Sequence, residues 1–214
     1  MLQDAPSRPR VGALNRRLRI GAPVAVVVTL LAAVGLALQA NRRAVHDYDS
    51  GPLQTGSDTT TGILVDVAQP FTFGGIVVYN TTAQPIVLDE IRLVPPAPPG
   101  MKILAIEVAG GDRRIGFVGA DHGYPPPDLR LYLRPFRGAR VPPERQPEGK
   151  EGTEIVFGLQ LNQAGTFGFE HVDVDYRVGH KRHRVRLEDG FVACAPPASY
   201  PDGCDREAFF RRRS

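Results

Sequence analysis

The sequence is poor in the residues that common hydrolytic mechanisms require. Beyond residue 60 its serines are Ser199 and Ser214, so the segment 61–195 contains no serine nucleophile. Neither a G-x-S-x-G motif nor an H-E-x-x-H motif occurs in the chain. These absences argue against serine hydrolases and zinc-dependent proteases of those types. We therefore predict a protein that is not an enzyme, with no catalytic residue, no cofactor and no metal ligand.

Cysteine is also scarce, since the chain has only Cys194 and Cys204. Their spacing fits neither a paired C-x-x-C zinc site nor a thioredoxin-like motif. Two nearby cysteines predict a disulfide if this part of the chain lies in an oxidising compartment, and two free thiols are the alternative. In the chain-entropy model, closing a loop of this length stabilises a fold by roughly 2 to 3 kcal/mol.

A continuous basic face is missing as well. The formal net charge is +3, but arginines gather at the two ends and the middle of the chain is mixed in sign. Because nucleic-acid binding needs a basic patch or stripe, we predict no nucleic-acid partner. The tail 205–214 places two phenylalanines beside three arginines, which indicates either a frayed end or a docking tail for an anionic lipid, a wall polymer or a protein.

One long uncharged run, IGAPVAVVVTLLAAVGLALQA, occupies residues 20–40. As a helix it is long enough to cross a hydrocarbon core of about 30 Å. Five arginines precede it within residues 1–19, whereas only Arg42 and Arg43 follow it closely. The positive-inside rule then predicts a cytoplasmic basic tail at 1–19, one transmembrane helix, and an extracytoplasmic remainder in the cell membrane. A cleaved signal peptide is the alternative, although its apolar run is usually shorter.

The composition changes again after the span. Residues 41–60 carry Ser, Thr, Gly and Asp without a period, which predicts a flexible stalk. From 61 to 195, short runs of Val, Ile, Phe and Leu predict an all-β domain. The segment 196–214 follows as a C-terminal disulfide loop and basic tail. We expect an immunoglobulin-like β-sandwich of about seven to nine strands.

Two runs at 71–80 and 85–94 are predicted to be adjacent strands, joined by a short connection suited to a hairpin. Between them, the pattern V-x-N-T-T-x-x-P-I-x-L at residues 78–88 resembles adjacent strands of bacterial immunoglobulin-like accessory domains. Together with the single span, it makes the chain similar to single-pass membrane proteins of high-GC Gram-positive bacteria that carry such a domain outside the cell. The resemblance implies an accessory or binding role at the cell envelope.

Further strands are predicted at 101–109, 128–136, 153–161 and 190–195. In the run at 128–136, leucines alternate with polar residues, which is typical of a half-buried strand with a basic outer face. This strand and the proline-rich segment 121–151 around it form the candidate contact surface. Its proposed partner-binding residues are Arg130, Tyr132, Arg134, Arg137 and Arg140.

The stretch HVDVDYRVGHKRHRVRLED predicts its own register. If Gly179 and His180 are the two turn residues, one face is apolar and the other pairs aspartates with arginines. The apolar pairs are Tyr176 with His183, Val174 with Val185, and Val172 with Leu187, and the charged pairs are Asp175 with Arg184 and Asp173 with Arg186, with His171 opposite Glu188. A slip of one residue would discard these pairs.

The same hairpin could be mistaken for a metal site, because His171, Asp173, Asp175, His180 and His183 lie close together in sequence. In the predicted register the histidines at 171 and 183 lie on opposite faces, and each aspartate faces an arginine. A solvated, paired face is therefore the better interpretation.

The sequence thus favours a non-enzymatic binding, scaffold or accessory module anchored at the cell envelope, with an envelope protein or anionic polymer as partner and an unknown oligomeric state. Two alternatives stay open. One is a carrier of a metal or small ligand, like periplasmic copper-binding sandwiches. The other is an envelope hydrolase that uses carboxylates.

Overall fold

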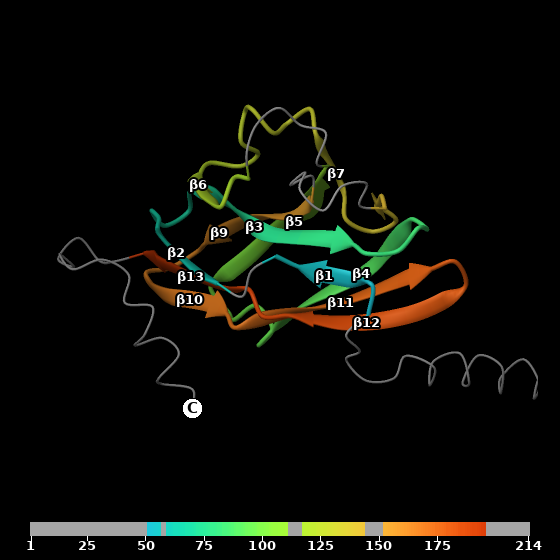
Figure 1. Ribbon diagram of the computed structural model, residues 1–214. Coiled ribbons are helices and arrows are strands. Elements are labelled where there is room, and N and C mark those ends of the chain that lie inside the picture. Colours follow the sequence, from blue (N-terminus) through green and yellow to red (C-terminus); the bar gives the residue numbers. More distant parts are fainter. Residues whose placement is uncertain (1–50, 57–58, 111–116, 144–151, 196–214) are drawn as a thin grey trace, which may run out of the picture. The chain divides into compact units, whose positions relative to one another are not determined.

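A computed structural model describes residues 51–56, 59–110, 117–143 and 152–195. Within these ranges the protein is all β, with thirteen strands and no helix (Figure 1). The strands in chain order are β1 (Leu53–Thr55), β2 (Thr60–Leu64), β3 (Pro70–Asn80), β4 (Ile86–Val94), β5 (Met101–Ala109), β6 (Ala120–His122), β7 (Leu133–Pro135), β8 (Arg140–Val141), β9 (Thr153–Leu161), β10 (Gly165–Phe169), β11 (His171–Val178), β12 (Lys181–Leu187) and β13 (Gly190–Ala195).

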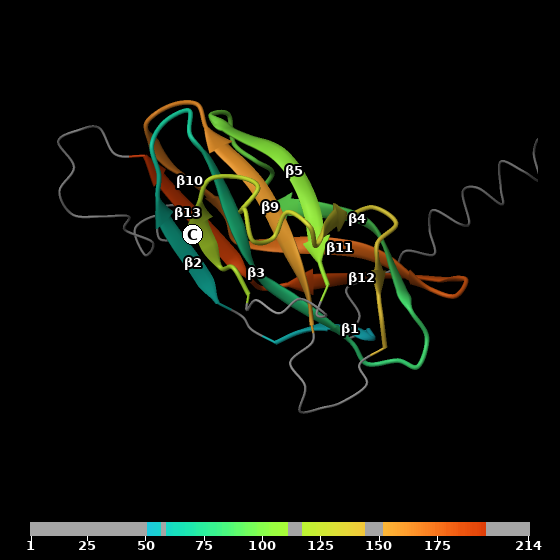
Figure 2. The same cartoon turned by 90° about the horizontal axis from the view of Figure 1, so that it is seen from above.

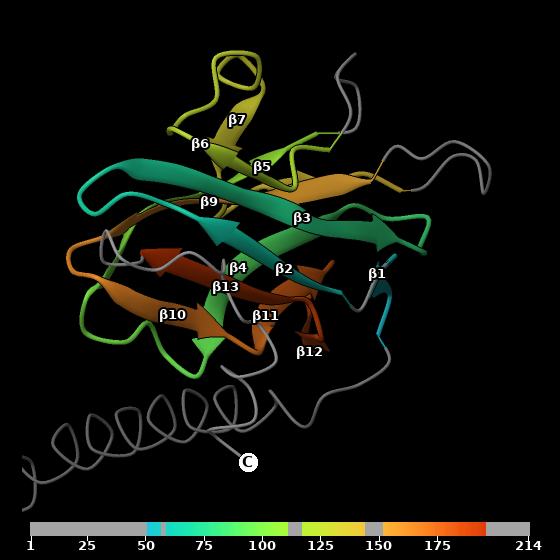
Figure 3. The same cartoon turned by 90° about the vertical axis from the view of Figure 1, so that its left-hand side faces the viewer.

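The strands form three sheets. Sheet A has the order β1-β3-β9-β5-β7, with β6 also paired to β3. Sheet B has the order β10-β13-β2, and sheet C has the order β12-β11-β4-β8. In Figures 2 and 3, sheet A forms one layer, and sheets B and C lie side by side in the other. This arrangement is consistent with a β-sandwich, as the sequence predicted.

The core lies between the two layers and is rich in phenylalanine. Phe73 of sheet A stacks on Phe191 of sheet B with ring centroids 4.4 Å apart, and it also contacts Phe157 and Phe169 at 5.8 Å. All four rings are at most 1% exposed. Offset and tilted contacts of this kind add to the apolar area that the rings bury, so this cluster holds sheets A and B together.

The connection after β3 does not form the predicted hairpin. β3 pairs with β1, β6 and β9, whereas β4 pairs with β11 and β8, so the chain changes layers between Asn80 and Ile86. Asn80 is 1% exposed, and its side-chain amide donates to the carbonyl oxygens of Gln84 and Val141 at 2.7 and 3.0 Å. These bonds fix a turn that connects two different sheets. The short connection between the two predicted strands has the same length as a hairpin loop, so its length alone does not distinguish the two.

Several other strand predictions are confirmed. The runs predicted at 101–109, 153–161 and 190–195 form β5, β9 and β13. The register predicted for β11 and β12 is confirmed from Val172↔Leu187 through Asp173↔Arg186 to Tyr176↔His183. The further pair of His171 with Glu188 lies beyond the ladder, because β12 ends at Leu187.

The strand count exceeds the expected seven to nine because β1, β6, β7 and β8 are short pieces of two or three residues. One of them, β1, lies within the range predicted as a stalk. Leu53 is 1% exposed and pairs with Asn80, so the domain begins before residue 61. The reason is that one buried leucine in an otherwise polar run is enough to add a short strand to the edge of β3.

Some predictions fall on residues that the structure does not describe. They concern the cytoplasmic tail, the span at 20–40 and the segment 196–214, which includes Cys204. Among the described segments there is no helix with the length and apolarity needed to span a bilayer. Cys194 lies on β13 and is 6% exposed, and its predicted bond to Cys204 stays a prediction.

Candidate binding surface

Residues 117–143 are here called the cap, and the part around Leu129 lies against the outer face of sheet A (Figure 1). Leu129 of the cap is fully buried with Ala109 of β5 and Val156 of β9, and Val118, Tyr132 and Leu133 pack around them. Since the other face of β9 lies in the main core, this strand is covered on both sides. That explains why almost every residue of β9 is buried.

The cap also contacts β9 through a glycine. A Cβ placed on Gly158 would lie 2.6 Å from the ring of Tyr124, so only glycine allows the ring to lie this close to the strand. The Tyr124 hydroxyl donates a hydrogen bond to Glu107 of β5. Burial, and then the adjacent Glu107 carboxylate, raise the pKa of Tyr124 well above its usual value.

A buried carboxylate holds the start of the cap. Glu154 of β9 is fully buried, and its Oε1 accepts from the N–H groups of Gly75 and Val118 at 2.8 and 2.9 Å. Gly75 lies at the bulge of β3, with φ of +89°, a conformation that glycine adopts without strain. Glu154 thus joins the bulge of β3 to the cap.

The strand predicted at 128–136 is wrong. Residues 127–132 form turns, and only Leu133–Pro135 is a strand. The N–H groups of Arg130 and Leu133 bond to the carbonyls of Pro126 and Leu129, each four residues back. These local bonds replace the sheet ladder, so the alternation of leucines does not define one face.

As a result, the five proposed partner-binding residues do not share one strand face. Leu129 is buried while Leu131 is 81% exposed, although both were predicted to point the same way. Tyr132 packs into the cluster beneath the cap, and Arg130 is exposed. Arg134 is exposed and donates to the carbonyl oxygens of Leu131 and Leu133.

The other two proposed residues, Arg137 and Arg140, lie at the edge of sheet C. The N–H of Gly138 donates to the carbonyl of Leu88, and the N–H of Leu88 donates to the carbonyl of Ala139. These two bonds place this part of the cap alongside β4. Both arginines are exposed. The five proposed partner-binding residues are therefore divided between the part of the cap that lies over sheet A and the part that lies at the edge of sheet C.

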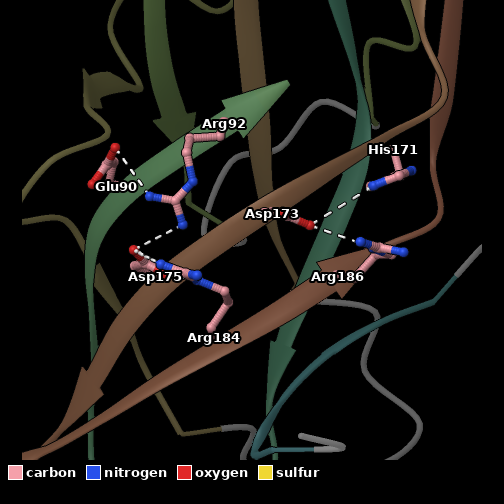
Figure 4. A network of polar contacts seen from close by, with 7 residues as sticks. All are labelled: Glu90, Arg92, His171, Asp173, Asp175, Arg184 and Arg186. Carbon is pink, nitrogen blue, oxygen red and sulfur yellow. Dashed lines mark hydrogen bonds and ion pairs between the residues drawn. The ribbon is translucent and has the colours of Figure 1, made fainter. Parts of the chain in front are cut away.

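The outer face of sheet C carries a network of ion pairs (Figure 4). Asp175 accepts from Arg184 at 2.6 Å and from Arg92 at 3.0 Å, and Arg92 also contacts Glu90 at 3.1 Å. Burial alone would raise the pKa of Asp175, but the hydrogen bonds from Arg184 and Arg92 outweigh it and lower that pKa below its usual value.

The same face includes a more buried pair. Asp173 is 6% exposed and lies 3.5 Å from Arg186, and the Nε2 of His171 lies 3.9 Å from the same carboxylate. The prediction that this hairpin face is solvated is therefore correct for Arg186 but wrong for His171 and Asp173. His171 and Asp173 lie at the end of β11 farthest from the turn, where β11 also pairs with β4. The sequence pattern of the two hairpin strands does not include this third strand.

The structure supports the reasons given against a metal site here. His183 stacks on Tyr176 with ring centroids 5.2 Å apart, on the face opposite Asp173 and Asp175, as the register predicted. In the described ranges, no group of three histidine, cysteine or acidic side chains has a geometry suited to a metal ion.

Sequence reasoning missed a row of residues across sheet C. Arg140 of β8 pairs with Val87 of β4, Val87 pairs with Arg177 of β11, and Arg177 pairs with Arg182 of β12. Arg177 is held by Asp89 through two hydrogen bonds of 2.8 and 3.0 Å. Half of this row could have been found, because the predicted hairpin register already places Arg177 opposite Arg182.

Comparison with known proteins identified no family. No family model matches the chain, and no curated protein matches it. Two similar solved structures are the VesB protease of Vibrio cholerae, at 6% identity and a TM-score of 0.34, and the CooA pilin subunit of enterotoxigenic Escherichia coli, at 11% identity and a TM-score of 0.33. Each alignment covers 68% of this chain, and they span 32% of the protease chain and 97% of the pilin chain. Neither similarity is close enough to assign an activity.

Proposed function

We propose that this chain is a single-pass membrane protein whose extracytoplasmic β-sandwich is a non-enzymatic binding module of the cell envelope. The observation that carries the proposal is the alternation of buried apolar residues and exposed arginines along the cap. Leu129, Phe136 and Val141 are at most 4% exposed, whereas the arginines between them face solvent. A segment fixed in this way holds its charged groups in place at low entropic cost, which favours binding.

The location rests on the sequence. The uncharged run at 20–40 supports a membrane anchor, and the arginines before it favour an N-terminus in the cytoplasm. The two facing, mainly antiparallel layers support the finer proposal of an immunoglobulin-like sandwich. A disulfide between Cys194 and Cys204 would agree with an oxidising compartment.

Topology is tested first. A reporter enzyme that is active only outside the cytoplasm is fused after Ser214 in living cells. We expect activity from this fusion and none from a reporter placed before residue 20. Activity of a cytoplasmic reporter at the C-terminal position would overturn the proposal.

Binding is tested by photocrosslinking in intact cells, with a photoreactive phenylalanine analogue at position 137 of the cap. The matched control carries the same analogue at position 162, an exposed residue in the turn between β9 and β10. We expect a crosslinked product at position 137 and none at 162. Equal yields at both positions, or none at either, would contradict a binding role for the cap.

A further inference from the structure

The row Arg140–Val87–Arg177–Arg182, here called the arginine row, crosses all four strands of sheet C. Residues directly opposite each other in an antiparallel ladder point to the same side. The flanking residues Ile86, Leu88 and Tyr176 are fully buried and face the core, so the row faces outward. Three cations therefore project from one line on the open face of the sheet.

Neither end of the row is neutralised by a residue that the structure describes. Arg140 and Arg182 are exposed, and neither has an ion pair with any described residue. Arg177 bonds to Asp89, yet its side chain is 43% exposed, and the bonds use only its Nε atom. The outer edge of its guanidinium thus still has donors available. Arg177 and Arg182 directly oppose each other, and like charges in that position repel, so an anion between them would relieve a cost already present in the fold.

The neighbouring positions on the same face do not extend this field. Asp175 forms ion pairs with Arg184 and Arg92, and Arg92 also contacts Glu90. Asp173 lies opposite Arg186 and contacts it. An anion is therefore attracted along one line, perpendicular to the strands. With strands about 4.8 Å apart, the line from Arg140 to Arg182 spans roughly 14 Å.

We propose that the arginine row binds a linear polymer of linked phosphate groups, which lies across the strands of sheet C. This inference rests on the proposed function and names the partner class of that binding module. Guanidinium groups bind phosphate oxygens with paired hydrogen bonds, and repeated anions on a chain can meet successive arginines. A planar anionic surface such as a lipid bilayer fits less well, because it would also meet the carboxylates of Asp89, Glu90 and Asp175.

The test uses the full-length protein in a non-ionic detergent and a fluorescently labelled linear polyphosphate as the probe. The variant Arg140→Ala/Arg182→Ala removes two positive charges from the row. The matched control Lys102→Glu changes the net charge equally, at an exposed position on β5. We expect the double variant to bind roughly tenfold more weakly and the control to bind within about twofold of the original protein. The slope of log affinity against log salt should fall by about two in the double variant, one for each arginine that no longer neutralises a phosphate.

A third variant tests the middle of the row. Asp89→Asn removes the charge that holds Arg177, so polyphosphate should bind more tightly than to the original protein. Weaker or unchanged binding would contradict a role for Arg177. Thermal unfolding of every variant is measured in parallel, and Arg182→Ala alone serves if the double variant does not fold.

Three results would overturn the inference. Equal losses of polyphosphate affinity in the double variant and in Lys102→Glu would show that only the net charge of the protein attracts the polymer. Vesicles of phosphatidylglycerol that bind as tightly, with the same dependence on the row, would indicate a membrane surface. If orthophosphate displaces the labelled polyphosphate at an equal concentration of phosphate groups, the row is a site for a single anion and not for a polymer. The reporter experiment that tests topology is independent of this binding assay. If the reporter shows an extracytoplasmic domain but the protein does not bind polyphosphate, this inference is rejected and the proposed function is not.

Discussion

The outer faces of sheets A and C occupy equivalent places in the sandwich but have opposite character. The face of sheet A lies beneath the cap, with Leu129 and Val156 fully buried there, and its carboxylates Glu107 and Glu154 bond to cap residues. The face of sheet C carries carboxylates and arginines in pairs, and most of these side chains are partly or fully exposed, although Asp173 and His171 are buried. The central strand β9 of sheet A is therefore buried on both faces, whereas the outer face of sheet C is largely accessible to solvent.

The difference follows from the residue pattern of the strands. β9 is buried along nearly its whole length, and its central residues 155–159 are uncharged and mostly apolar, as expected for a strand covered on both sides. In β11 and β12, charged and apolar residues alternate with a period of two. Thus the pattern of a strand indicates whether its outer face needs a cover, although it does not indicate which segment provides that cover.

The largest expected effect comes from removing the main anchor of the cap. Leu129→Ala deletes a fully buried side chain and should lower the free energy of unfolding by about 2 to 5 kcal/mol. Denaturant unfolding of the full-length protein measures it. Leu131→Ala is the control, because Leu131 is 81% exposed and its loss should cost no more than about 0.5 kcal/mol. Equal costs would mean that the cap is not packed on sheet A.

The next effect concerns the charged face of sheet C. Asp175→Asn keeps the shape of the side chain but removes the charge that accepts from Arg92 and Arg184. At neutral pH it should lower the free energy of unfolding by about 1.5 to 3 kcal/mol. Glu90→Gln is the control, since Glu90 is 60% exposed at its side chain and its pair should contribute less than about 1 kcal/mol.

The pH dependence of Asp175→Asn sharpens this prediction. Because the pKa of Asp175 is lowered in the folded protein, its contribution is fully present above the ordinary carboxyl pKa. It is lost as the pH falls through the lowered value. The difference in stability between the variant and the original protein should therefore shrink below about pH 4. A difference that stays constant into acid would show that the charge of Asp175 does not matter.

A smaller effect is expected from Tyr124→Phe on the covered face. The change removes one hydrogen bond to Glu107 but keeps the ring against Gly158. It should cost about 0.5 to 1.5 kcal/mol in denaturant unfolding. Tyr124→Ala should cost more, because it also removes the ring, and equal costs would mean that the ring contributes nothing to the cap.

The smallest effect is expected at the end of the arginine row. Arg182→Ala removes a cation that opposes Arg177, so stability should change by no more than about 0.5 kcal/mol and should rise rather than fall. Thermal unfolding at low salt measures it, and high salt should abolish any gain. Arg177→Ala is the comparison, and it should destabilise, because it leaves Asp89 without its partner.

Local pairing could be predicted from the sequence because it depends on neighbours. The hairpin of β11 and β12 has a two-residue turn and complementary charges, so only one register satisfies both faces. The strands β5, β9 and β13 were equally readable as apolar runs bounded by turns. These features need no information from distant parts of the chain.

Pairing between distant segments could not be predicted. The change of layer after Asn80 depends on a bond to Val141, which is 61 residues away in sequence. Residues 128–136 of the cap were predicted as a strand because their leucines alternate, but hydrogen bonds four residues back and the packing of Leu129 on Val156 determine the local structure. The arginine row was missed for the same reason, since Arg140 reaches sheet C only through β8.

The parallel pair of β2 and β13 has a consequence for the order of events in folding. Thr60 opposes Gly190 and Leu64 opposes Cys194, so β2 can pair only after β13, the last of the described strands, is available. Pairings of such long sequence separation slow folding, because a large loop must close before they form. Sheet B therefore cannot be completed until synthesis has passed residue 195. If the domain is exported as an emerging chain, its second layer is completed only after residue 195 has crossed the membrane.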